Sequence, residues 1–357
     1  MIMQIKIGSK IISSGGKPYF IADIAANHDG SLERAFKLIE LAKEAGADVA
    51  KFQNFKANKI VSKVGFDSMP KKSHQSGWKK SVYEVYEEAS LCNEWTEKLK
   101  EKCDEVGIEY MTSPYDFESV DHADNYVNAF KIGSGDITWT EMLSYIAHKN
   151  KPILLATGAS NISDVDRAVN TITKINSNLI LMQCNTNYTA NHENYKYINL
   201  NVLKSYSEKY PNCILGLSDH TYGHTTVLGA IALGARVIEK HFTDDNNRIG
   251  PDHKFSMNPT TWKDMVAASN DLWHSLGDGI KRVEDNEKES LIVQQRGIYI
   301  AKNITKGQVI CYEDLISLRP LKNDGIPPYY VDKIIGKRAG NNLDTDSYLK
   351  WEDIDND

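Results

Sequence analysis

Eight short apolar segments, rich in isoleucine, valine and aromatic residues, recur along the chain and constrain its fold more than any other feature. In order, they are YFIADIA, DVAKFQN, IEYMTSP, AFKIGSG, ILLATG, LILMQCN, ILGLSDH and VIEKHF. Stretches of helical periodicity separate them, such as residues 31–47, where Ala35, Leu38 and Ile39 mark one face and Gly46 ends the pattern. Strands that alternate with helices pair in parallel through right-handed crossovers.

This alternation leaves two architectures open, a (β/α)₈ TIM barrel and a doubly wound open sheet. Eight units in about 280 residues match the usual size of the barrel. Small and polar residues collect at the carboxyl end of every segment, where a barrel gathers its active-site groups. No glycine-rich dinucleotide fingerprint follows the first segment. We therefore predict an α/β protein built on a (β/α)₈ barrel.

The sequence changes in character after the eighth unit. The charged stretch at residues 274–290 has little capacity to form a core, and short strand-like segments follow it. We predict a catalytic barrel domain over residues 1–280, a linker over residues 281–295 and a small, mainly β domain over residues 296–357.

Charge and cysteine content exclude several classes of partner. The 357 residues carry 42 basic and 48 acidic side chains, evenly mixed, for a formal charge of −6. This composition offers no sequence-wide field for a nucleic acid or an anionic membrane. The five cysteines form no CxxC pair, the first ten residues have no apolar signal-peptide core, and no apolar run approaches the roughly 20 residues that span a bilayer. We expect a cytoplasmic protein with reduced thiols.

Two histidines end the seventh and eighth segments, His220 in LGLSDH and His241 in VIEKHF. If these segments are neighbouring strands, their ends lie roughly 5 Å apart, and both imidazoles can reach one metal ion. Two histidines with an open coordination sphere form a Lewis-acid site. Each histidine alone is more commonly a backbone hydrogen-bonding partner. Glu239 shares a face with His241, either near the metal or as the partner of an imidazole.

Two lysines lie inside otherwise apolar segments, Lys51 in VAKFQ and Lys131 in FKIGSG. An unpaired ammonium group is costly to bury, so both predict an anionic partner. Gln53 shares a face with Lys51, and a turn of small residues with Ser134 follows Lys131. The backbone NH groups of that turn suit a phosphate or a carboxylate. The alternative, a surface lysine on an edge strand, conflicts with a closed barrel.

Other polar residues end the remaining segments or follow the eighth. Polar side chains are expected at the same rim from Ser113, Thr157, Thr186, Tyr188, Ser218, Asp23, Asn27 and His28. Ser31 is expected to cap the following helix, and turn formation is the alternative to a site role for the stretch from Asn27 to Ser31. The loop NNRIGPDHKFSMNP contributes Arg248, Asp252 and His253, either to substrate selection or to a solvated surface.

Seven motifs in one order resemble the sialic acid synthase (nonulosonate synthase) family. They are ANHDGS, AGADVAKFQ, FKIGSGD, ATGAS, GLSDHT, EKHFT and GPDHKFSMNP. The tail GIYIAKNITKGQVICYEDLISLRP with IIGKRAGNNL is similar to that family's C-terminal antifreeze-like (SAF, β-clip) domain. The match extends over almost the whole chain.

The resemblance implies condensation of phosphoenolpyruvate with an open-chain N-acylated hexosamine, typically N-acetylmannosamine, to a nine-carbon 2-keto acid plus phosphate. It also implies a divalent cofactor, Mn²⁺ or Mg²⁺, on His220 and His241. By motif, the phosphoenolpyruvate site comprises Lys51, Ser113, Lys131, Ser134 and Ser218, and the sugar site comprises Gln53, Tyr188 and Asp252. Asp23 and Glu239 complete the expected catalytic set with the two histidines, since a carboxylate there can accept a proton.

Arg319 matches the family arginine that reaches from the C-terminal domain of one subunit into the barrel of its partner, which implies a domain-swapped homodimer. Three positions depart from the common pattern. Asp23 and Asp136 stand where glutamates are usual, and Thr186 replaces an asparagine. Each shortened carboxylate moves its charge by one methylene group, and a displacement near 1 Å is significant at a reacting centre.

Three other functions remain compatible with the sequence. The same reaction on another acceptor would give legionaminic acid, pseudaminic acid or the deaminated acid formed from mannose. A class I aldolase would use Lys51 or Lys131 as a Schiff base and would leave the two histidines without a role. A non-catalytic carbohydrate-binding protein is suggested only by the antifreeze-like tail.

Overall fold

The computed structural model describes residues 3–69, 80–189 and 191–355. These residues form two compact units, Met1–Gly277 and Asp278–Asp357, which are described separately. The segment 281–295, interpreted above as a linker, falls within the second unit. It contains the 3₁₀ turn η5 (Asp285–Glu287) and helix α12 (Lys288–Gln294), whose side chains are exposed.

The first unit is a closed barrel of eight parallel strands, which confirms the predicted fold class. Each of the eight apolar segments forms one strand, and the strands follow one another around the barrel until β10 pairs with β3. The strands are β3 (Tyr19–Asp23), β4 (Val49–Asn54), β5 (Glu109–Pro114), β6 (Phe130–Ile132), β7 (Ile153–Ala156), β8 (Leu179–Cys184), β9 (Ile214–Asp219) and β10 (Val237–His241).

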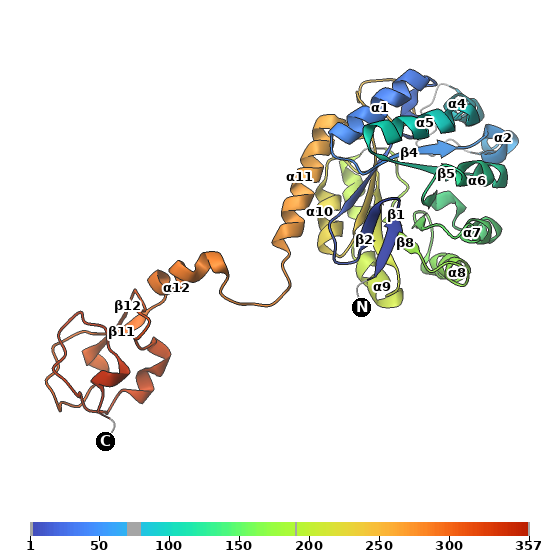
Figure 1. The fold of residues 1–357 in the computed structure, drawn as a ribbon. Helices are drawn as coiled ribbons and strands as arrows, with labels where there is room; N and C mark the ends of the chain where they lie inside the picture. Colours follow the sequence, from blue (N-terminus) through green and yellow to red (C-terminus); the bar gives the residue numbers. More distant parts are fainter. Residues whose placement is uncertain (1–2, 70–79, 190, 356–357) are drawn as a thin grey trace. The chain divides into compact units, whose positions relative to one another are not determined.

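Helices surround the strands as an outer layer (Figure 1). They are α1 (Leu32–Glu44), α2 (Ala57–Ile60), α3 (Lys63–Asp67), α4 (Val82–Ala89), α5 (Asn93–Val106), α6 (Phe117–Asp124), α7 (Thr140–Ala147), α8 (Ile162–Thr173), α9 (Val202–Lys209), α10 (Thr225–Ala232) and α11 (Pro259–Ser275). Helix α1 shows why the sequence is helical here. Ser31 caps it by accepting a hydrogen bond from the Arg34 backbone, and Leu38 and Ile39 are fully buried against the strands.

Side chains alternate between the lumen of the barrel and the helical layer. The inward positions near the start of the strands are apolar and form one cluster, to which Tyr19, Val49, Ile180, Ile214 and Val237 belong. An amino-terminal hairpin of β1 (Gln4–Ile7) and β2 (Lys10–Ser13) adds Ile5, Ile7 and Ile12 to this cluster. The hairpin, which the sequence analysis did not predict, therefore closes the amino-terminal end of the lumen.

The second unit has its own small core. Strands β11 (Gly297–Ile300) and β12 (Leu315–Leu318) pair antiparallel, and isolated bridges join several further segments. The core includes Ile298, Ile300, Ile310, Ile326 and Leu349, all nearly inaccessible to solvent. In the part of the chain that the structure describes, no helix has both the length and the apolar character needed to cross a bilayer.

Gly216 provides a test of how tightly the lumen is packed. A Cβ atom at this position of β9 would lie 2.8 Å from the carbonyl oxygen of Val237 and 2.9 Å from Cγ of Met182. We expect Gly216→Ala to lower the free energy of unfolding by about 1–3 kcal/mol, because backbone atoms cannot yield as a flexible side chain can. Urea-induced unfolding measures this change. Gly15→Ala is the matched control, since no atom lies within 4 Å of its added Cβ, and equal losses in both variants would contradict the prediction.

Candidate active site

The carboxyl ends of the barrel strands bring most of the predicted site residues together. The strand register pairs Asp23 with both Lys51 and His241, Gln53 with Ser113, and Glu239 with Ser218. These positions continue the inward face whose earlier members are apolar. The lumen is therefore apolar near the start of the strands and charged near their ends.

Two lysines and two carboxylates form a buried network at the charged end. The Lys51 ammonium donates to Oδ2 of Asp23 at 2.7 Å and lies 3.9 Å from Oε2 of Glu239. Lys131 lies 3.1 Å from Oε1 of Glu239, and the Ser218 hydroxyl donates to the same oxygen at 3.0 Å. Both lysines therefore have carboxylate partners within the protein, which the sequence analysis did not foresee.

Burial and ion pairing shift the pKa values of Glu239 and Lys51 in opposite directions. Burial acts to raise the pKa of Glu239, but Lys131 and Lys51 outweigh it and lower the value to about 2. Burial disfavours the charge on Lys51, yet Asp23 and Glu239 raise its pKa above the usual range. Glu239 is therefore an anion and Lys51 a cation at neutral pH. Oε2 of Glu239 is buried without a hydrogen bond in the described structure.

The two histidines lie side by side at the ends of β9 and β10, as predicted. Their ring centroids are 5.4 Å apart. Burial lowers the pKa of both His220 and His241 to about 3, so both rings are neutral near pH 7. Nδ1 of His220 lies 2.9 Å from the Asn185 carbonyl oxygen, and a neutral ring that donates this bond leaves the lone pair of Nε2 available.

The donor set fits a divalent cation with two protein ligands. Nδ1 of His241 is buried without a hydrogen bond, and its Nε2 is 3.7 Å from Asp23. Within the described ranges, no group of three or more histidine, cysteine or acidic side chains is arranged to hold a metal. Glu239 contacts the lysines instead of an imidazole. A cation here would therefore rely on His220 and His241, with water or substrate oxygens in the remaining positions.

A cavity of about 530 Å³ opens in front of these groups. The predicted residues that line it are Gln53, Ser134, Asp136, Thr186, Tyr188, His241 and Asp252. Burial raises the pKa of Asp136 to about 6 and that of Asp252 to about 7. The Tyr188 ring packs 4.2 Å from the His220 ring, centroid to centroid. Ser113 lies deeper, where its hydroxyl is 3.5 Å from the Lys51 ammonium.

Aromatic side chains complete the cavity, and sequence reasoning missed them. Phe55, Tyr86 and Tyr115 line its wall, and the Phe255 ring packs 4.9 Å from the His241 ring, centroid to centroid. Tyr115 directly follows the third barrel strand, and this position in the sequence could have identified it as a residue of the cavity. Arg319 belongs to the second unit, where it is exposed after β12.

Comparison with known proteins assigns the chain to a family. The NeuB family model matches residues 38–281, and the SAF domain model matches residues 295–355. The chain belongs to the NeuB family. It also carries a SAF domain, which confirms the resemblance drawn from the motifs.

Three relatives illustrate the similarity. The chain is 35% identical to the N,N'-diacetyllegionaminic acid synthase of Legionella pneumophila, with 94% of each chain covered. It is 32% identical to a pseudaminic acid synthase of Campylobacter jejuni, with 95% of this chain and 97% of the relative covered. The crystal structure of the N-acetylneuraminic acid synthetase of Leptospira borgpetersenii matches with a TM-score of 0.71 and 27% identity, covering 82% of this chain and 96% of the other.

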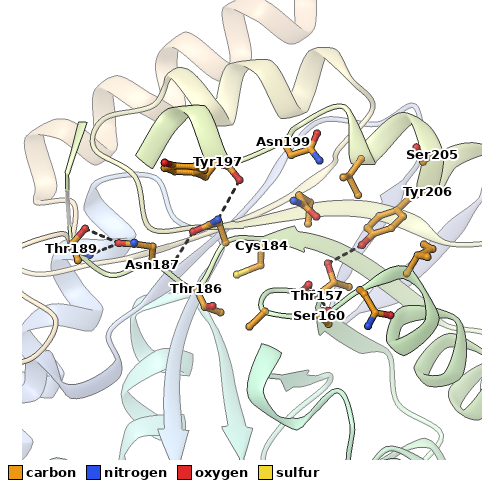
Figure 2. Close-up of a pocket in the computed structure, with 16 residues that line it drawn as sticks. Thr157, Ser160, Cys184, Thr186, Asn187, Thr189, Tyr197, Asn199, Ser205 and Tyr206 are labelled. Atoms are coloured by element: carbon orange, nitrogen blue, oxygen red, sulfur yellow. Dashed lines mark hydrogen bonds between the residues drawn. The ribbon is translucent and has the colours of Figure 1, made fainter. Parts of the chain in front are cut away.

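A second, larger pocket of about 960 Å³ adjoins the cavity of this NeuB-family barrel (Figure 2). Ala159 and Thr186 line both. Figure 2 shows the Tyr206 hydroxyl hydrogen-bonded to Thr157. The Thr157 hydroxyl itself donates to the Met182 carbonyl. Amides and hydroxyls predominate, and none of its 16 described lining residues is charged. The titratable groups gather at the smaller cavity, which is therefore the candidate active site.

A buried histidine holds the loop that carries Asp252. His253 is inaccessible to solvent, with Nε2 2.8 Å from Asp29 and Nδ1 2.7 Å from the Thr243 hydroxyl. Arg248 also pairs with Asp29, at 2.8 Å. These contacts fix the loop after β10 to the loop after β3. Asn27 also joins these two loops, because it donates to the Phe242 carbonyl at 2.8 Å, and Ser31 caps α1 as expected.

We expect His253→Ala to loosen this loop while the barrel stays folded. Hydrogen bonds to a charged group contribute about 1.5–3 kcal/mol, which corresponds to roughly tenfold or more in local opening. Hydrogen–deuterium exchange of residues 244–258, followed by mass spectrometry, measures this opening. Lys254→Ala is the control, because Lys254 is exposed on the same loop. Equal exchange in both variants would show that the histidine does not hold the loop.

Proposed function

We propose that this protein condenses phosphoenolpyruvate with an open-chain N-acylated hexosamine in a reaction that depends on a divalent metal. The products are a nine-carbon 2-keto sugar acid and phosphate. The observation that carries the proposal is the convergence of Lys51, Lys131 and the two neutral histidines at one end of the barrel, in front of the cavity. Membership of the NeuB family supports the reaction class.

Phosphoenolpyruvate occupies the inner part of the site in this proposal. Lys51 and Lys131 offer fixed cations to its phosphate and carboxylate, and Ser113, Ser134 and Ser218 offer hydroxyl groups. Ser134 already accepts a hydrogen bond from the Gly158 backbone at 2.9 Å, which leaves its own proton for an anion. Charged hydrogen bonds of this kind are stronger in a buried site than in water.

His220 and His241 would hold Mn²⁺ or Mg²⁺ next to the acceptor aldehyde. A bound cation would polarise the carbonyl, which a weak carbon nucleophile such as C3 of phosphoenolpyruvate requires. The charges of the two lysines and the two carboxylates cancel in the protein. Phosphoenolpyruvate should therefore bind more tightly when the divalent cation adds a further positive charge to the site. The anion and the cation are therefore expected to bind as a set.

The carboxylates Glu239 and Asp23 would accept and pass on protons during the reaction. A bond forms between C3 of phosphoenolpyruvate and the aldehyde carbon, water adds at C2, and the C2–O bond to phosphate breaks. The water gives up both of its protons as it becomes the ketone oxygen: one is needed by the aldehyde oxygen, which becomes a hydroxyl group, and the other leaves with the phosphate. Glu239 is ionised at neutral pH and has one oxygen without a hydrogen bond that can pass on the first of these protons, and Asp23 lies on the neighbouring strand β3.

The acceptor is an N-acylated hexosamine that reaches the cavity wall at Gln53, Tyr188 and Asp252. N-acetylmannosamine is the acceptor that the motifs imply. A diacetamido sugar is the second candidate, because two relatives above are synthases of legionaminic and pseudaminic acids and the present chain departs from the common pattern at Asp136 and Thr186. Mannose itself is the third.

Aldolase chemistry through a Schiff base is disfavoured by the surroundings of Lys51. A Schiff base needs a neutral amine, whereas Asp23 and Glu239 raise the pKa of this lysine. Lys131 is also paired with a carboxylate, 3.1 Å away.

A further part of the proposal is a homodimer in which the SAF domain of one subunit covers the barrel of the other. Arg319 would then contact the acyl group of the acceptor. Its exposure in the second unit leaves its guanidinium available for such a contact.

Incubation with phosphoenolpyruvate, Mn²⁺ and a panel of hexoses tests the reaction. We expect release of inorganic phosphate and a product heavier than the sugar by one pyruvate unit, identified by mass spectrometry. A chelator should abolish turnover, and His220→Ala and His241→Ala should lower it by at least about 100-fold even with Mn²⁺, since only one ligand remains. No phosphate release with any acceptor would refute the proposal, and undiminished turnover in chelator would refute the metal requirement alone.

A mixture of two variants, each with impaired activity, tests the shared site. Arg319→Ala should raise the KM for the acceptor and leave phosphoenolpyruvate binding largely intact, while His220→Ala removes a metal ligand. After subunit exchange, the mixture should regain part of the wild-type activity, because one barrel in each mixed dimer receives an intact tail. Each variant alone is the control. Proven exchange without recovery would contradict the swapped arrangement.

A further inference from the structure

A second buried ion pair is formed by the two residues that immediately precede His220 and His241 in the sequence, and it plays no part in the chemistry proposed above. Asp219 is the last residue of β9 and Lys240 the penultimate residue of β10, and they are partners in the strand register. The Lys240 ammonium donates to Oδ2 of Asp219 at 2.5 Å. Each side chain is only 1% exposed.

The pair occupies the outer face of the barrel wall. Glu239 and His241 face the lumen, so the alternation along β10 turns Lys240 toward the helical layer. The contacts agree with this placement. Thr226, on helix α10, donates to Oδ2 of Asp219 at 2.8 Å.

The network holds the backbone on both sides of His220. Thr221 donates to Asp219 through its hydroxyl at 2.8 Å and through its backbone NH at 3.3 Å. The Lys240 ammonium also donates to the Thr221 carbonyl oxygen, at 2.7 Å. Lys240, the residue before His241, is therefore bonded to the residues that precede and follow His220.

The ion pair matters more for the position of the two histidines than for the stability of the fold. A buried ion pair commonly adds little to stability relative to apolar residues of similar volume, because both charges lose their hydration. What the pair can specify is position. Regular pairing between β9 and β10 ends at Asp219 and Lys240, so His220 lies just beyond the ladder that would otherwise place it.

We propose that the Asp219–Lys240 pair is a positioning device that sets the separation and orientation of His220 and His241. Both residues face the helical layer instead of the lumen, and both act through the histidines that follow them. The proposal rests on the proposed function for the role of the histidines as ligands, but the placement itself is a property of the metal-free protein.

The test compares single variants with a double variant. Asp219→Asn or Lys240→Met alone leaves one buried charge without its partner and should lower the midpoint of urea-induced unfolding. The double variant Asp219→Asn/Lys240→Met leaves no unpaired charge and should unfold close to the wild-type midpoint. Asp121→Asn/Lys149→Met is the matched control, because it removes a partly exposed pair 2.6 Å apart, with Asp121 on α6 and Lys149 in the turn after α7.

Two readouts then separate positioning from folding. Mn²⁺ alone, titrated by electron paramagnetic resonance, should bind about 10- to 100-fold more weakly to the double variant than to the wild type or the control. In metal-free protein, the ¹⁵N–¹H signals of the His220 and His241 rings should shift, and those of His122 and His148 should not. Wild-type Mn²⁺ affinity and unchanged ring signals in the folded double variant would overturn the proposal.

The outcomes also distinguish this inference from the proposed function. If wild-type protein does not bind Mn²⁺, the metal requirement fails, and the ring signals of the metal-free protein alone decide the inference. If the double variant does not fold, Thr226→Val replaces it, because this change removes one hydrogen bond from Asp219 and keeps the ion pair. Shifted His220 signals in that variant would support the proposal, and unchanged signals would refute it.

Discussion

Closure of the barrel is the constraint on which the rest of the structure depends. Eight parallel strands in a ring have one inner face, and strand geometry sends every second side chain into it. The start of that face is apolar, and the hairpin of β1 and β2 closes it with Ile5, Ile7 and Ile12. Polar residues are therefore possible only toward the carboxyl ends, where the lumen opens into the cavity.

Charge compensation determines what the open end can hold. Lys51 and Lys131 are buried, and each lies next to a carboxylate, so neither charge is left unpaired when no anion is bound. The same pairing keeps Glu239 ionised and leaves one of its oxygens without a hydrogen bond. The histidines, by contrast, are made neutral by burial, which is the state in which an imidazole can bind a metal.

The inner and outer faces of strands β9 and β10 carry residues with different roles. The inner face carries Ser218, Glu239 and His241. Glu239 contacts Ser218 and the lysines, and His241 lines the cavity. The outer face carries Asp219 and Lys240, whose bonds run to α10 and to the backbone around His220. A chain segment of two residues thus combines a reactive group on one side with its support on the other.

The sequence by itself determined the fold class, because periodicity is a local property and eight strand segments alternating with helices have few closed arrangements. It also identified the two histidines and the two lysines, since polar residues at the ends of apolar strands stand out and parallel strands align their ends. The motifs then identified the family, including the SAF domain.

The tertiary structure decided which side chains meet, because distances between strands depend on register and closure, which no local pattern contains. Only the structure paired Lys131 with Glu239, packed Phe255 against His241 and joined His253 to Asp29. Lys240 shows the difference most clearly. In the sequence it is one more lysine in an apolar run, and its partner Asp219 is 21 residues away, so only the pairing of β9 with β10 brings the two together.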